Sequence, residues 1–475
     1  MHPFYSRAHY PPDDDTIQAA REKSALFPQK ADLRSQPVLR KKNLYAAIER
    51  LVNDTSPENT YRQNVYTSVT GGGSATSRPL FFATDALENR RHRAYFGDFL
   101  RKTGIIKRGD WVLTTHHGGN LYRSLDLTLE TMENAGASVL AAGHSSSPDE
   151  IVHPLQEFNV NVLTGDGTQI VSLVHHLSNL TEGRDKIKLD KIIYTSEGLT
   201  AVQRAHIYTV LGRVKICFVL GSAEAGPYGA SNPDLTLPGP DVNHNDFIID
   251  TRMTLIEILP LSYPDVGGDS IPGLFTDGET GVIAQTMLTR LRNPVIRYLT
   301  GDVGSLHRLP EHARSFISEE DWPHFRILRL QGRDTRFSFM WDGVDFQFDT
   351  LTTLISQSKL KILQWQVILD KLEPSLEILL EIRLLRNLQT ECAVAKETDI
   401  DCLRNFFHID SASEHRFKIS FLSDLSGFEL SKTGRKVISY VAAALTPKAK
   451  VYAALADDFN DVQLGQDSLH EQDLE

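Results

Sequence analysis

Short apolar runs of β-prone residues alternate with helical segments through the middle of this chain, and this alternation restricts its fold more than any other feature. The runs are Trp111–Thr115, Ser138–Ala142, Val160–Leu163, Lys191–Thr195 and Lys215–Leu220. The segments between them repeat apolar residues every three to four positions, as amphipathic helices do. Strand, helix, strand, helix at this spacing predicts a mostly parallel sheet with helices on its faces. Such sheets bind their ligands beyond the carboxyl ends of the strands.

The pattern changes twice toward the end of the chain. After about Asp250, apolar runs with tight turns predict antiparallel strands, over Asp246–Pro260, Gly281–Leu288 and Asn293–Val303. Further on, residues 362–385 predict two strands around a Glu-Pro turn, and Lys436–Leu445 predicts a closing helix. Near the start, Asn43–Val52 has helical periodicity.

We therefore expect an α/β fold made of two domains and a tail. The large N-terminal domain, residues 1–332, would contain mostly parallel sheets flanked by helices plus a smaller antiparallel region. A small α+β C-terminal domain would follow over residues 333–450, after the change in composition at Gly332-Arg333-Asp334. The acidic tail, residues 457–475, has the composition of a disordered segment.

Charge and cysteine content exclude several classes of function. The chain has 475 residues, a net charge of −11 and an isoelectric point near 5.9, which argues against a broad nucleic-acid or anionic-membrane surface. No apolar run is long enough to span a bilayer, and the first residues lack the apolar core of a secretory signal. The 3 cysteines are scattered and form no disulfide framework or metal knuckle, so we expect a cytoplasmic protein.

A run of small polar residues, TSVTGGGSATSRP at Thr67–Pro79, follows a predicted strand. Its backbone N–H groups can wrap around an anion, and its hydroxyls can donate to phosphate oxygens. The residues with this capacity are Thr67, Ser68, Thr70, Gly71, Gly72, Gly73, Ser74 and Thr76. No lysine follows the glycines, so this is not the common GxxxxGK[ST] loop. An ordinary surface loop would have the same composition.

Four further segments follow in order along the chain. Val219–Gly229 (VLGSAEAGPYG) places one carboxylate, Glu224, on a small-residue turn after a predicted parallel strand. Gly278–Ile283 (GETGVI) is a turn that leads into a strand. Arg297–Gly304 (RYLTGDVG) places Asp302 on a turn flanked by glycine, and Leu330–Phe337 (LQGRDTRF) lies at the composition break.

In this order, the segments resemble those of the adenylate-forming, acyl-activating enzymes, and the likeness is greatest to the phenylacetate–coenzyme A ligases. The glycine-rich run occupies the place of that family's phosphate loop. The adenine-binding segment matches Gly221, Ser222, Ala223 and Glu224. The TGD motif matches Thr300-Gly301-Asp302, and the hinge motif matches Gly332-Arg333-Asp334. The resemblance covers roughly residues 27 to 445.

The resemblance implies a role for each matched residue. The loop Thr67–Thr76 would hold the phosphates of ATP. Glu224 would help to hold Mg²⁺, because a hard cation prefers carboxylate and phosphate oxygens. Asp302 would accept hydrogen bonds from the ribose hydroxyls, with Arg333 donating to the same sugar. The implied cofactors are ATP, Mg²⁺ and, for the second half of the reaction, coenzyme A.

Two departures from the family pattern concern charge and glycine. The family supplies a catalytic lysine from a Gly-Lys motif on a mobile C-terminal domain, where this chain has SKTGRKV at Ser431–Val437. Arg435 stands in the lysine position with Lys436 beside it, and we favour Lys436 over Arg435 for this role. Arginine is planar and bulkier than lysine, so the exchange is not conservative. Val69 stands where the family has glycine. Either this chain repositions its catalytic cation, or its adenylation step is weakened or lost.

Two adjacent histidines, His116 and His117, follow the first predicted strand of the parallel sheet, where the family builds its acyl pocket. One of them would line the pocket or deprotonate the acceptor. Neighbouring residues on an extended chain point to opposite faces, so at most one is expected to enter the site. A second pair, His175 and His176, lies in a helical pattern and is expected to be structural.

The resemblance implies an enzyme that activates a carboxylic acid with ATP, releases pyrophosphate and transfers the acyl group to coenzyme A. One alternative is an amide synthetase that uses an amine as the acceptor. Another is a relative that binds nucleotide without catalysis. The partners are thus small molecules, with no nucleic acid and no membrane. Which acid is used, and whether the chain forms a homodimer, stay open at the level of sequence.

Overall fold

The computed structural model describes most of the chain in a series of segments. These are residues 22, 33, 36–57, 59–69, 81–119, 121–196, 198–236, 244–261, 263, 275–290, 295–333, 338–342, 344–357, 360–372, 377–386, 393–411, 413–430 and 437–442. Contacts divide the chain into two compact units, and the smaller one consists mainly of residues from Thr335 onward. The two units are described separately below.

The larger unit is built around an 11-stranded sheet. One part of it is parallel, with neighbours in the order β9-β8-β7-β3-β6. These strands are β3 (Trp111–Thr114), β6 (Ser138–Ala141), β7 (Val162–Asp166), β8 (Lys191–Thr195) and β9 (Lys215–Ser222). The predicted parallel strands are therefore confirmed. Strands β7 and β8 are buried almost throughout, as expected for central strands of a parallel sheet.

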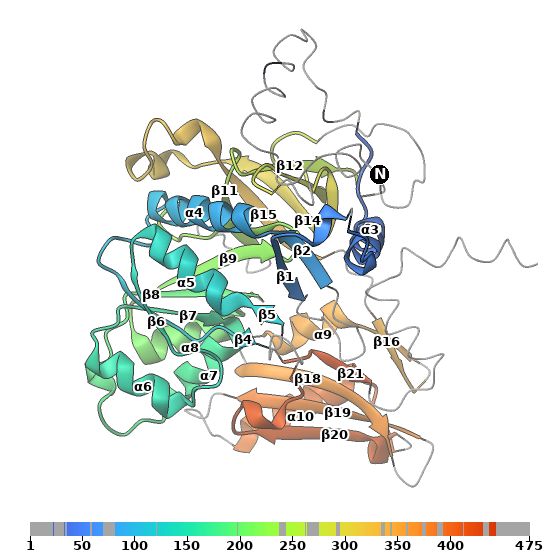
Figure 1. Ribbon diagram of the computed structural model, residues 1–475. Helices are drawn as coiled ribbons and strands as arrows, with labels where there is room; N and C mark the ends of the chain where they lie inside the picture. The colour runs from blue at the N-terminus through green and yellow to red at the C-terminus, as the bar shows by residue number, and fades with distance from the viewer. Residues whose placement is uncertain are drawn as a thin grey trace, which may run out of the picture. The chain divides into compact units, whose positions relative to one another are not determined.

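Helices connect the parallel strands: α5 (Ser124–Ala135), α6 (Pro148–Glu157), α7 (Gly167–Ser178) and α8 (Ala201–Leu211). A further helix, α4 (Ala86–Lys102), precedes β3. Helices α4 and α5 pack side by side along the sheet (Figure 1). Local signals set their ends: Ser147 forms a capping box with Glu150 before α6, and Gly136 ends α5 with a left-handed φ of 102°.

The antiparallel strands continue the same sheet. In the order β12-β13-β14-β15-β11-β10, each pairs antiparallel with its neighbour, and β10 pairs antiparallel with β9. The strands are β10 (Gly226–Ala230), β11 (Asn245–Asp250), β12 (Thr254–Leu259), β13 (Gly281–Met287), β14 (Tyr298–Arg308) and β15 (Phe325–Arg333). The predicted change from parallel to antiparallel pairing is thus confirmed, within one sheet.

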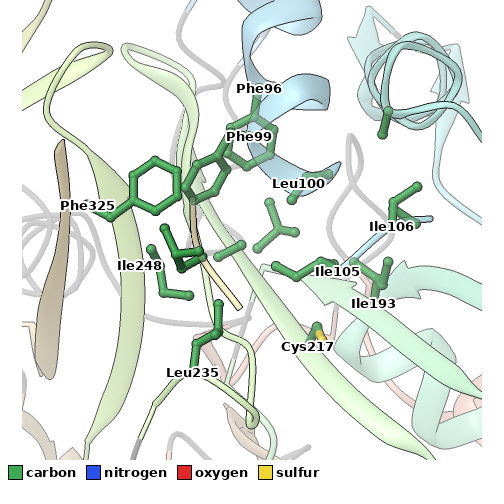
Figure 2. Packing of buried hydrophobic residues seen from close by; sticks show 14 of the residues in the cluster. Phe96, Phe99, Leu100, Ile105, Ile106, Ile193, Cys217, Leu235, Ile248 and Phe325 are labelled. Atoms are coloured by element: carbon green, nitrogen blue, oxygen red, sulfur yellow. The ribbon is translucent and has the colours of Figure 1, made fainter. Parts of the chain in front are cut away.

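A core of apolar side chains fixes helix α4 against this sheet. Figure 2 shows Phe96 and Phe99 of α4 beside Phe325 of β15. The ring centroids of Phe96 and Phe99 are 5.4 Å apart, and Phe99 meets Phe325 edge to face at 5.6 Å. Aromatic pairs with these geometries add to the stabilisation from burial alone. The same core includes Val219 of β9 and Ala230 of β10, the two strands that carry the turn described below.

The smaller unit contains a four-stranded mixed sheet in the order β20-β19-β18-β21. The strands are β18 (Ile362–Lys371), β19 (Ile378–Arg386), β20 (Phe417–Leu422) and β21 (Tyr440–Ala442). The remaining elements are β16 (Ser338–Trp341), β17 (Val344–Gln347), α9 (Phe348–Ile355) and α10 (Ala393–Phe406). The two strands predicted around the Glu-Pro turn are the antiparallel pair β18 and β19.

The helix predicted over Lys436–Leu445 is wrong where the structure describes that segment. Residues 440–442 form β21, which pairs parallel with β18 at Val367↔Tyr440 and Ile368↔Val441. Ile438 and Val441 are buried against Ile368. Burial beside an open sheet edge outweighs the helical preference of the alanine-rich run that follows.

Candidate functional site

Several predicted site residues lie outside the described residues. They are Thr70, Gly71, Gly72, Gly73, Ser74, Thr76, Arg435 and Lys436. Arg333 belongs to β15, but its side chain also lies outside the described part of the chain. The roles predicted for these residues therefore stay predictions.

Strands β1 (Val65–Val69) and β2 (Phe81–Asp85) hold the two ends of the glycine-rich segment together. They pair antiparallel, with Thr67 opposite Ala83, Ser68 opposite Phe82 and Val69 opposite Phe81. Thr67 and Ser68 are half-buried in β1. A pair of strands that leads into and out of a loop of small residues is a common support for a phosphate site.

Glu224 lies on the tight turn that joins β9 to β10. The strands on either side of this turn pair at Ser222↔Gly226, and the Ala225 N–H donates to Ser222 Oγ at 3.1 Å. Gly226 has a φ of +72°, which favours glycine because other residues would be strained there. The turn residues predicted from sequence, Gly221 to Glu224, are therefore held in one defined conformation.

Two phenol groups hold the carboxylate of Glu224. Tyr45 Oη donates to Glu224 Oε1 at 3.1 Å, and Tyr298 Oη donates to the same oxygen at 3.0 Å. Tyr45 lies on helix α3 (Lys41–Asn53), which confirms the helix predicted there, and Tyr298 begins β14. Burial, and then the negative charge of Glu224, raise the pKa of Tyr45, so its hydroxyl stays a donor.

Asp302 lies on β14, directly opposite Arg333 of β15. Its N–H donates to Thr300 Oγ1 at 3.1 Å, and Gly301 between them has a φ of +79°. Burial raises the pKa of Tyr228, and the nearby charges of Asp302 and Glu224 raise it further. The charges of both predicted carboxylates, Glu224 and Asp302, thus act on the same buried hydroxyl.

The buried His116 lies in a second polar cluster, at the carboxyl ends of β3, β7 and β8. Its Nδ1 is 3.0 Å from Thr114 Oγ1, and its Nε2 is 3.2 Å from Thr195 Oγ1. The Thr195 hydroxyl donates to Asp166 Oδ1 at 3.1 Å, so it must accept from His116. His116 is therefore held with its proton on Nε2, and both ring nitrogens are engaged.

His117 faces different neighbours. Its ring lies 3.7 Å from that of His144 and 5.8 Å from that of Tyr122, centroid to centroid, and it is fully buried. His175 and His176 lie on α7, as their helical pattern predicted. His175 is buried with its ring 5.9 Å from that of His206, and His176 Nε2 is 3.0 Å from Asp149 Oδ1.

Sequence reasoning missed the residues that hold the predicted ones in place. These are Tyr45 and Tyr298 on Glu224, Arg290 and His92 behind its turn, and Thr195 with Asp166 beside His116. Tyr298 could have been found, since it lies two residues before the TGD motif. Tyr45 could not, because it precedes Glu224 by 179 positions and carries no motif.

The chemistry of the Glu224 carboxylate fits a hard divalent cation such as Mg²⁺. Among the described residues, Tyr45 and Tyr298 both donate to Oε1 of Glu224. The other carboxylate oxygen, Oε2, is therefore available to a cation. No group of 3 or more His, Cys, Asp or Glu side chains placed to bind a metal occurs in the described part of the chain. Mg²⁺ is commonly bound by one or two carboxylates together with phosphates, so a single carboxylate is sufficient.

Comparisons with known proteins identify the fold. A scan against protein-family models and a search of curated proteins find no match. Among solved structures, the chain is similar to 2-hydroxyisobutyryl-CoA ligase in the postadenylation state in complex with R3-HIB-AMP, with a TM-score of 0.60 and 16% identity, over 96% of this chain and 87% of that chain. An open conformation of that ligase, in complex with 2-HIB-AMP and CoA, gives a TM-score of 0.51 and 16% identity, over 92% and 86% of the two chains.

These matches extend over nearly the whole length of both chains. The chain therefore has the fold of the adenylate-forming ligases, as the motif order predicted. No helix in the part of the chain that the structure describes is long and apolar enough to cross a membrane.

Proposed function

We propose that this protein is an ATP-dependent acyl-activating ligase. A carboxylate oxygen of the acid would attack the α-phosphorus of ATP, and the bond from that phosphorus to the pyrophosphate would break. Acyl-AMP and pyrophosphate would result, and coenzyme A would then take the acyl group as a thioester. The Glu224 carboxylate, fixed by two phenols on the turn after β9, carries this proposal together with Asp302 opposite Arg333. The fold has a solved example in a CoA ligase in complex with R3-HIB-AMP.

Each side chain has a task suited to its surroundings. Asp302 would accept hydrogen bonds from the ribose hydroxyls, with Arg333 on the opposite strand as a donor to the same sugar. Glu224 would hold Mg²⁺ through Oε2 while the two phenols fix Oε1. When bound, Mg²⁺ would neutralise charge on the phosphates. The protein's main contributions are alignment and charge stabilisation.

Positive charge near the α-phosphate is the remaining requirement, and we assign it to Lys436 with Arg435 as second choice. The basis is their position in the SKTGRKV segment, where the resembling family carries its catalytic lysine. A cation is needed because the transition state gathers negative charge on the phosphorus oxygens.

The hydrogen bonds of His116 favour a pocket wall over a general base. A base needs a ring nitrogen with a free lone pair, and both nitrogens of His116 bond to threonine hydroxyls. We therefore place His116 in the wall of the acyl pocket, beyond the carboxyl ends of the parallel strands. His117, packed on His144, would shape the same end of the sheet.

The experiment that tests this function is an ATP–pyrophosphate exchange assay with a panel of carboxylic acids. We expect exchange that depends on one class of acid and on Mg²⁺. Product analysis with coenzyme A and with amines then separates thioester from amide formation. No exchange with any acid, together with no nucleotide binding in calorimetry, would refute the proposal. Nucleotide binding without exchange would point instead to the non-catalytic relative.

A further inference from the structure

A buried arginine, Arg290, lies directly behind the turn that carries Glu224. It follows β13 and is 6% exposed. Its Nη1 donates to the carbonyl oxygen of Ala223 at 3.2 Å and to that of Glu224 at 3.3 Å. The guanidinium thus binds the backbone of the residue whose side chain is the candidate metal ligand.

The surrounding residues keep the guanidinium in this place. A Cβ atom added at Gly226 would lie 2.5 Å from Nη2 of Arg290 and 2.8 Å from Nε2 of His92. His92 in turn contacts the Pro227 carbonyl through Nε2 at 2.9 Å and Thr289 Oγ1 through Nδ1 at 2.7 Å. Since a carbonyl can only accept, Nε2 of His92 carries the proton and Nδ1 accepts from Thr289. The turn, the arginine and the histidine therefore pack as one unit.

Among the described residues, this buried cation has no ion-pair partner. In the described part of the chain, no carboxylate lies within ion-pair distance of Arg290, and its Nε has no hydrogen-bond partner. Burying an unpaired charge costs stability, and a purely structural contact to two carbonyls does not need a full positive charge.

We propose that Arg290 is the positioning residue for Glu224. It fixes the turn from behind, so that the phenols of Tyr45 and Tyr298 and the guanidinium together hold Glu224 Oε2 at the place where Mg²⁺ bound to the triphosphate would meet it. This inference rests on the proposed function. Arg290 would contact neither the nucleotide nor the metal. Its loss should nevertheless weaken binding of ATP with Mg²⁺ and leave the contact of Asp302 with the ribose unchanged.

Binding of AMP without metal and binding of ATP with Mg²⁺ should respond differently to the loss of Arg290. Asp302 is on β14 and is held by its own strand pairing, so binding of AMP without metal should not depend on Arg290. Binding of ATP with Mg²⁺ should, because a displaced carboxylate loses its contact with the metal. Small displacements at a site of this kind have large effects.

The test compares Arg290→Met, which removes both the charge and the donors, with Arg290→Lys and Arg290→Gln. Calorimetry measures the Kd of AMP without metal and of a non-hydrolysable ATP analogue with Mg²⁺. For Arg290→Met we expect the Kd of the magnesium complex to rise about tenfold or more, while that of AMP changes less than about twofold. Arg290→Lys should recover part of the loss, and Arg290→Gln less.

Arg252→Met is the matched control, since Arg252 also donates through its guanidinium but pairs with Asp250 and Asp321. It should change neither Kd. If Arg290→Met does not fold, the comparison of Arg290→Lys with Arg290→Gln still tests the charge. Equal loss of both ligands, or no loss of either, would overturn the positioning role. A wild-type protein that binds neither AMP nor the magnesium complex would instead overturn the proposed function.

Discussion

At the scale of single residues, Glu224 combines burial with a fixed geometry. It is 7% exposed, and phenols from α3 and β14 both donate to its Oε1. A buried carboxylate held by neutral donors keeps its remaining oxygen available to a cation. Glutamine at this position could still accept both hydrogen bonds through its amide oxygen but would be a poor ligand for Mg²⁺.

Glu224→Gln should therefore leave the fold intact and slow adenylate formation. We expect a loss of about two to three orders of magnitude in pyrophosphate exchange, the usual scale for removing one electrostatic contact at a reacting centre. Thermal unfolding of the variant without ligand serves as the control for folding. Exchange close to the wild-type rate would remove Glu224 from the metal site.

Asp302→Ala tests the ribose contact in the same region. A ligand that binds only the folded state raises stability by RT ln(1 + [L]/Kd). ATP with Mg²⁺ should raise the melting temperature of the wild type, and Asp302→Ala should abolish most of that rise. Asp370→Ala, which alters an exposed carboxylate on β18, is the matched control. An undiminished rise in Asp302→Ala would show that the ribose lies elsewhere.

At the scale of elements, α7 and α8 bury a pair of histidines, His175 and His206, whose ring centroids are 5.9 Å apart. Burial, and then the neighbouring His175, lower the pKa of His206 to about 4 from an ordinary value of 6.5. The folded protein therefore holds His206 neutral. As the pH falls from 6.5 toward 4, His206 gains a proton in the unfolded state but not in the folded state. The free energy of unfolding therefore decreases over this range and is unaffected by His206 above pH 6.5.

His206→Leu should accordingly weaken this pH dependence. We expect the fall in unfolding free energy between pH 6.5 and pH 4 to shrink by about 1 kcal/mol, measured by urea unfolding across that range. His153→Gln, at an exposed position on α6, should leave the dependence unchanged. An identical pH dependence in wild type and His206→Leu would contradict the assignment.

The segment Ser431–Val437 carries the prediction about the catalytic cation. Lys436→Ala should greatly slow formation of acyl-AMP, because its charge would offset the charge that develops at the α-phosphate. Transfer from a supplied acyl-AMP to coenzyme A should stay nearly intact. Arg435→Ala is the comparison and should have the smaller effect. If neither substitution slows the first half-reaction, the family's mechanism does not apply to this chain.

The parallel strands could be predicted because burial on both faces leaves a clear trace in sequence. Strand β8, for example, is buried at all positions but its last, and its apolar run Ile192-Ile193-Tyr194 predicts a strand. The strand β21 could not be predicted, since its residues gain their stability from one edge of β18. Its short run, Tyr440–Ala442, precedes alanines that favour a helix.

In the candidate site too, residues with a local sequence pattern could be predicted, and residues that act through distant contacts could not. Glu224 and Asp302 were found because tight turns need glycine at fixed offsets, which makes a recognisable pattern. Tyr45 and Arg290 were not, because they act through contacts with residues 179 and 66 positions away. Contacts of this range are set by the packing of the whole sheet and leave no local pattern.

At the scale of the whole molecule, the matched fold extends over 96% of the chain, and the glycine-rich, Glu224 and Asp302 segments occur along it in the order of the resembling family. We propose that this protein joins a carboxylate to AMP, and an isotope label shows whether a carboxylate oxygen is transferred to AMP. Acid uniformly labelled with ¹⁸O in its carboxyl group is the substrate of choice, drawn from whichever class supports pyrophosphate exchange.

The measurement is the mass of the AMP released after complete turnover with ATP, Mg²⁺ and coenzyme A. If the carboxylate attacks the α-phosphorus and the acyl–oxygen bond then breaks, one labelled oxygen stays on AMP and none enters pyrophosphate. We predict AMP that carries one ¹⁸O for each thioester formed. AMP without the label, or ADP with labelled phosphate, would contradict the proposed chemistry.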